Sequence, residues 1–162
     1  MSREISKSDV FRKYIFDEMA RTTKMDINDL EKYVDSLSDH KSKELCHHLS
    51  NSRKNAVYSF ISKGPDRWIV KTVNISNIYV GGINGRVNGY FNRNGWLLKN
   101  ICKDKDIRKH REFKKWGDIH HRSLSLIAHK NGCKYRIVDG NHRAVKLACD
   151  GKKEFKLISY KR

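Results

Sequence analysis

The stretch YRIVDGNHRAVKLACDG, residues 135–151, decides the fold of the larger part of this chain. Apolar and polar side chains alternate at its start, as they do in a strand, and Asp139-Gly140 ends that pattern. From His142 the apolar residues recur at helical spacing, and Gly151 stands where a helix would end. The stretch predicts a strand that passes directly into a helix through the turn DGNHR, residues 139–143.

The DGNHR turn has the composition of a phosphate site. The first N–H groups of a helix have no partners within it, and the helix dipole attracts anions to that end. Gly140 lets an anion approach the backbone, and Asn141 can cap the helix. Arg143 can offer a two-pronged guanidinium to phosphate oxygens, and His142 adds a donor or a proton-transfer group. The residues that we predict to bind phosphate or nucleotide are Gly140, Asn141, His142 and Arg143.

A carboxylate in this turn needs a separate reason, because it repels phosphate unless it holds a metal, accepts a proton or anchors the turn. We predict Asp139 as a ligand of Mg²⁺ or Mn²⁺, and catalytic roles for Asp139 and His142. Asp118, in WGDIHHRS, is a further catalytic candidate beside His120 and His121. The alternatives are structural: an ordinary Asp-Gly-Asn turn, and a polar helix end whose histidines suit the helix dipole.

Charge points to a polyanionic partner. Residues 1–63 hold 12 Lys and Arg against 10 Asp and Glu, whereas residues 64–162 hold 23 against 8, out of a net formal charge of +17. Such an excess favours DNA or another nucleic acid, although solvated lysines alone are the alternative. The predicted nucleic-acid-binding residues are Arg86, Arg93, Lys99, Arg108, Lys109, Arg111, Lys114 and Lys115.

The cysteines and the apolar runs indicate where the protein resides. Four cysteines stand far apart and form no CxxC pair, which argues against a zinc ribbon or a disulfide framework. No apolar run approaches the length of a membrane span. We expect a cytoplasmic protein with no membrane partner.

Residues 1–63 form a predicted helical appendage to a domain at 64–162. A first helix starts with Ser8 or Asp9 as its cap, a second is capped by Asp26, and a third covers 42–62 with a possible break near Asn51. Gly64-Pro65 marks the boundary. Beyond it the predicted elements are a strand at 67–80, a loop at 81–95, a helix at 97–119, a hairpin turning at Asn131-Gly132, the helix from His142 and a strand at 154–160.

This order resembles the ParB/sulfiredoxin-like superfamily over about residues 67–160, with DGNHR between strand and helix as the most specific feature. The resemblance implies an α+β fold, a mixed sheet with flanking helices, here preceded by a small helical region. It also implies that the turn binds the phosphates of a nucleotide such as ATP, ADP or CTP. Sulfiredoxins carry a catalytic cysteine where this chain has Asn141, and partition proteins continue into a helix-turn-helix, so neither activity is expected.

The leading prediction for function is a metal-assisted DNase of the ParB-like nuclease type. One alternative is an ATP- or ADP-dependent kinase of free serine, although no Asp or Glu occurs between Asp66 and Asp104 to serve as the base that those kinases carry. The other alternative is a DNA-binding regulatory or inhibitory protein without catalysis.

Overall fold

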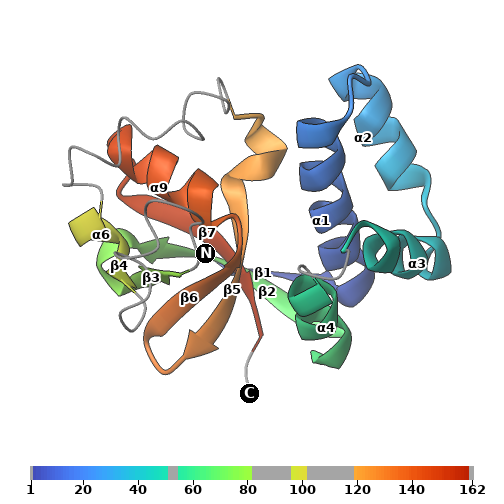
Figure 1. Cartoon of the computed structure of the whole chain (residues 1–162). Helices are drawn as coiled ribbons and strands as arrows, with labels where there is room; N and C mark the ends of the chain where they lie inside the picture. Colours follow the sequence, from blue (N-terminus) through green and yellow to red (C-terminus); the bar gives the residue numbers. More distant parts are fainter. Residues whose placement is uncertain (1, 51–54, 82–95, 102–118, 161–162) are drawn as a thin grey trace. The chain divides into compact units, whose positions relative to one another are not determined.

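A computed structural model describes residues 2–50, 55–81, 96–101 and 119–160 of the chain (Figure 1). The chain divides into two compact units. We call Glu4–Trp68 the helical unit, and Ile69–Arg162 together with Met1–Arg3 the sheet unit. The chain mixes helices and strands, as the α+β prediction states. No helix of the described residues is both long enough and apolar enough to span a membrane.

The helical unit is organised around its first helix. Its helices are α1 (Lys7–Thr22), α2 (Ile27–Ser36), α3 (Asp39–Leu49) and α4 (Asn55–Lys63). Helix α1 packs against each of the other three. The buried apolar side chains of α1 and α2 are Val10, Phe11, Tyr14, Ile15, Phe16, Leu30 and Val34.

The ends of these helices correct two predictions. Helix α1 is capped by Ser6, whose Oγ accepts the N–H of Asp9 at 3.1 Å while the Asp9 carboxylate accepts the Ser6 N–H. Asp9 is thus the second half of a capping box and not the cap, so the predicted start was wrong. Asp26 caps α2 as predicted. The third predicted helix is divided into α3 and α4, on either side of the break expected near Asn51, but it begins at Asp39, after its cap Ser38, and not at residue 42.

The sheet is mixed in strand direction. Its described strands are β1 (Ser2–Ser6), β2 (Arg67–Asn74), β3 (Ile78–Val80), β4 (Trp96–Leu97), β5 (Ser125–Asn131), β6 (Lys134–Asp139) and β7 (Glu154–Ser159). They are hydrogen-bonded in the order β1-β2-β7-β5-β6-β3-β4. Strand β3 runs parallel to β6, and β5 runs parallel to β7. Strand β1 was not predicted.

The single strand predicted at 67–80 is broken. A 3₁₀ turn at Ile75–Asn77 separates β2 from β3, and the Asn74 side chain caps it by accepting the Ser76 N–H at 2.9 Å. Strand β2 then pairs with β7 whereas β3 pairs with β6. The break therefore takes the chain from β2, near one edge of the sheet, to β3, near the opposite edge.

Two helices cover one face of this sheet, which we call the core face (Figure 1). They are α6 (Leu98–Ile101) and α9 (Asn141–Cys149). The buried cluster between helices and strands includes Ile78, Val80, Leu98, Ile101, Leu126, Tyr135, Ile137, Ala144, Val145, Phe155 and Leu157.

Of the helix predicted at 97–119, the structure describes the two ends. Leu97 belongs to β4, α6 covers Leu98–Ile101, and Ile119 is not helical. Residues 102–118 lie outside the described residues, and His121–Leu124 form a 3₁₀ helix.

Glycines with positive φ form the hairpin turn and the end of α9. Strands β5 and β6 form the predicted hairpin, but its turn is Gly132-Cys133, one residue later than predicted, because Asn131 still pairs with Lys134. Gly132 has a φ of 62°, a conformation that favours glycine. Gly151 ends α9 as predicted, with a φ of 98° and its N–H bonded to the Ala148 carbonyl at 3.0 Å.

Candidate phosphate-binding turn

The DGNHR turn lies where β6 passes into α9. Asp139 is the last residue of β6, and α9 begins at Asn141, one residue earlier than predicted. Strand β6 carries a bulge just before the turn: Ala128 faces Ile137, but Ile127 faces Asp139. A bulge re-aims the end of a strand, so the turn leaves the sheet from an irregular position.

Gly140 is the N-cap of α9 and can only be glycine. Its φ of 97° and ψ of 27° lie in the left-handed region. A Cβ atom there would stand 2.7 Å from Nη2 of Arg143 and 2.8 Å from Cδ2 of Leu126, and both of these side chains are buried. The first helical bond runs from the Ala144 N–H to the Gly140 carbonyl at 2.8 Å. The prediction that Asn141 caps the helix was therefore wrong, because Asn141 is already inside it and the N-cap is Gly140.

The Asn141 side chain ties two segments of the sheet unit together. Its Oδ1 accepts the backbone N–H of Gly81 at 3.1 Å. Gly81 follows β3 directly, and β3 runs parallel to β6, so the carboxyl ends of these strands meet at one edge. Asn141 thus fixes the start of α9 to the end of β3.

Replacing Asn141 by alanine is expected to lower the free energy of unfolding by about 1–2 kcal/mol, because the buried N–H of Gly81 loses its acceptor. Asn141→Asp keeps the acceptor and places negative charge in the first turn of α9, so it is expected to retain most of the stability. Urea unfolding of the two variants measures both values. Equal losses would show that the hydrogen bond contributes nothing.

Arg143 lies behind the turn. Arg143 is buried, with only 3% of its surface exposed, and its guanidinium lies against Gly140. The sequence predicted that this guanidinium faces phosphate directly. Its position beneath the Gly140 backbone instead gives it a role in supporting the turn from the core face.

Arg136 is a further cation beside the turn, and it was not predicted as a binding residue from the sequence. It lies in the middle of β6 and is exposed, and its Nη2 comes within 3.2 Å of the point where Gly81 would carry a Cβ atom. Its guanidinium therefore lies at the edge where Gly81 meets Asn141. Because side chains alternate along YRIV, Arg136 points to the other face of the sheet from the buried Tyr135 and Ile137. Only the pairing of β3 with β6 brings Arg136 close to Gly81 and the turn.

Of the other predicted site residues, the structure describes three. Asp139 and His142 are partly exposed on either side of Gly140 and Asn141, and Lys99 is exposed on α6. Outside the described residues lie Arg86, Arg93, Arg108, Lys109, Arg111, Lys114, Lys115 and Asp118.

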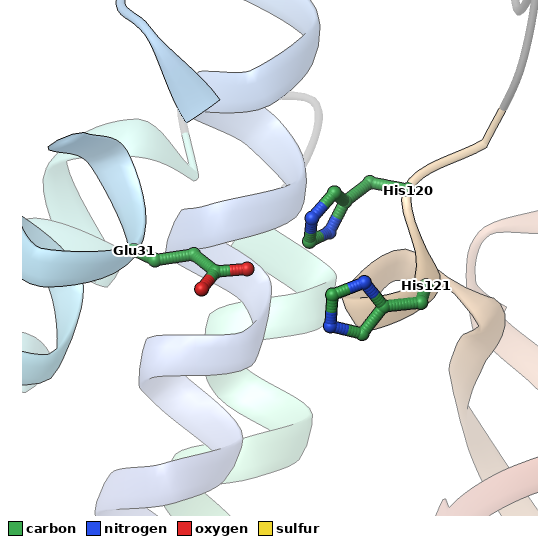
Figure 2. Close-up of side chains that lie close together, drawn as sticks. All are labelled: Glu31, His120 and His121. Atoms are coloured by element: carbon green, nitrogen blue, oxygen red, sulfur yellow. The ribbon is translucent and has the colours of Figure 1, made fainter. Parts of the chain in front are cut away.

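His120 and His121 lie side by side in the sheet unit (Figure 2). Their ring centroids are 4.1 Å apart, and Nδ1 of His120 accepts the N–H of Arg122 at 3.2 Å, which caps the 3₁₀ helix His121–Leu124. The third side chain drawn in Figure 2, Glu31, belongs to α2 of the helical unit. His120 therefore has a structural function as a cap.

Comparison of the chain with protein-family models, with curated proteins and with solved structures finds no match.

Proposed function

We propose that the sheet unit binds nucleic acid with one phosphate group at the Asp139–Arg143 turn, and that it hydrolyses DNA as a ParB-like nuclease of the ParB/sulfiredoxin-like superfamily. The observation that carries this proposal is the exposed Arg136 guanidinium beside Gly81, at the edge where Asn141 begins α9. It places a positive charge next to the start of α9, where the N-cap residue is a glycine and offers no side-chain oxygen to the first N–H groups. The 23 Lys and Arg against 8 Asp and Glu in residues 64–162 support a polyanionic substrate.

The turn offers groups for hydrolysis. The Asp139 carboxylate is a hard oxygen ligand of the kind that Mg²⁺ and Mn²⁺ prefer. A divalent ion bound there would supply Lewis-acid activation of water. His142 would hold or move a proton near the scissile phosphate. Arg143 would keep Gly140 in its left-handed conformation, and Arg136 would attract the substrate.

A second candidate is a DNA-binding protein without catalysis. The burial of Arg143 favours it, because a guanidinium that supports the turn from inside does not stabilise a reacting phosphate at the surface. The two candidates share the binding surface and differ in turnover, so one experiment separates them.

Asp139→Asn is expected to reduce DNA cleavage by about 100-fold or more while leaving DNA binding within about twofold, because the amide cannot bind a divalent ion as a carboxylate does. Cleavage of linear and circular DNA is followed with Mg²⁺ or Mn²⁺, and binding by gel retardation at low salt. Asp150→Asn is the matched control, since Asp150 is an exposed carboxylate in the same unit, just after α9.

Each outcome decides between the candidates. Cleavage by the wild type that Asp139→Asn retains would remove Asp139 from the chemistry. Retardation without cleavage would establish the non-catalytic candidate. Neither retardation nor cleavage at low salt would refute nucleic-acid binding altogether.

A further inference from the structure

The sheet has a second face, turned away from α6 and α9, on which four side chains lie together. Tyr79 on β3 is in register with Arg136 on β6, and Arg136 is in register with His129 on β5. Side chains in register share a face, and Lys134, two residues before Arg136, is on the same one. Their strand neighbours Tyr135 and Ile137 are buried on the core face. We call Tyr79, His129, Lys134 and Arg136 the basic row.

Among the residues that the structure describes, the two charged side chains of this row, Lys134 and Arg136, form no ion pair with a carboxylate. Both residues are exposed. Nζ of Lys134 lies 5.6 Å from the centroid of the Tyr79 ring, so a cation and an aromatic face adjoin. Two exposed positive charges beside an aromatic ring are complementary to an anion that also carries flat apolar groups.

The basic row leads to the proposed phosphate site. The Arg136 guanidinium lies beside Gly81, and the Gly81 N–H is bonded to Asn141 at the start of α9. A polymer with a phosphate at the turn can therefore extend its next phosphates along β6 toward Lys134.

We propose that the basic row binds single-stranded nucleic acid, with Lys134 and Arg136 contacting phosphates and Tyr79 stacking on a base. The inference rests on the proposed function, and it adds the strandedness of the substrate. A base can stack on a protein ring only when it is not already stacked within a duplex, whereas duplex binding needs phosphate contacts alone. The tyrosine beside the two cations is thus the feature that favours a single strand.

The test uses fluorescence anisotropy with a labelled oligothymidine of about 15 nucleotides and a duplex of equal length, over a range of salt concentrations. Tyr79→Leu is expected to weaken single-strand binding about tenfold and to leave duplex binding unchanged. Tyr79→Phe keeps the ring and is expected to bind as the wild type does, which separates stacking from folding.

Lys134→Ala is expected to reduce the slope of log K against log salt for the single strand by about 0.7, the value for one phosphate contact. Lys71→Ala removes an equal charge from the same sheet and serves as the control. Lys71 is exposed and in register with Leu157, so it lies on the core-face side, and its loss is expected to leave the slope unchanged.

The outcomes separate this inference from the proposed function. Duplex binding and cleavage with no effect of Tyr79→Leu on the single strand would overturn the inference and leave the proposed function standing. Single-strand binding that depends on Tyr79, in a protein that cuts no DNA, would support the inference and refute the catalytic proposal. Equal losses for single strand and duplex in Tyr79→Leu would also overturn the inference.

Discussion

Gly140→Ala is expected to lower the free energy of unfolding by about 3 kcal/mol or more. Two costs add at this position. The left-handed backbone, with a φ of 97°, strains any residue that carries a Cβ atom, and that atom would meet Arg143 and Leu126 at 2.7 and 2.8 Å. Leu126 is fully buried and Arg143 nearly so, so either side chain must displace packed neighbours in order to withdraw.

Gly151→Ala is the matched control for this variant. Gly151 has almost the same φ, 98°, but no atom lies within 4 Å of the position of its Cβ. Its replacement therefore carries the conformational cost alone, about 1 kcal/mol. Urea unfolding of both variants separates strain from packing. Equal losses for the two variants would show that the contacts around Gly140 relax without cost.

Asp17→Ala is expected to cost about 3–5 kcal/mol, through a different mechanism. Nζ of Lys13 and a carboxylate oxygen of Asp17 form an ion pair one turn apart on α1, and the two side chains are only 9% and 4% exposed. Removal of the carboxylate leaves the ammonium buried without that anion. The double variant Lys13→Met, Asp17→Leu removes both charges and is expected to be less destabilised than Asp17→Ala.

The Lys146–Asp150 pair provides the control. It has the same spacing, from Lys146 on α9 to Asp150 just after the helix, and an N–O distance of 2.9 Å, but the Asp150 side chain is 61% exposed. Asp150→Ala is expected to change the free energy of unfolding by about 0.5 kcal/mol or less, because water screens an exposed pair. Thermal and urea unfolding provide the comparison. If Asp17→Ala were as mild as Asp150→Ala, burial of the pair would not determine its contribution.

Features that depend on near neighbours could be predicted from the sequence. Asp26 caps α2, β5 and β6 form a hairpin, and Gly151 ends α9, because each depends on a few consecutive residues. Strand β1 could not be predicted, because SREIS has one apolar residue and no alternation. Its strand conformation comes from pairing with β2, which no local pattern reports.

In the candidate site, too, the features set by consecutive residues could be predicted, and those set by contacts between distant residues could not. The turn was visible in DGNHR, since a strand, a glycine and a helix succeed one another there, but the left-handed backbone of Gly140 was not. The bond from Gly81 to Asn141 joins residues 60 positions apart, and the place of Arg136 beside Gly81 follows from the parallel pairing of β3 and β6. The burial of Arg143 was equally hidden, because a charged residue after a turn is ordinarily exposed.

The position of β7 in the sheet has a consequence for synthesis of the protein. Strand β7 is the last of the described strands along the chain, yet it lies between β2 and β5. While the ribosome still holds residues 154–159, both of those neighbours present an unpaired edge to other chains. The sheet of the nascent protein therefore stays open until β7 is released, and chaperones or a lower growth temperature would most improve the yield of folded protein at this step.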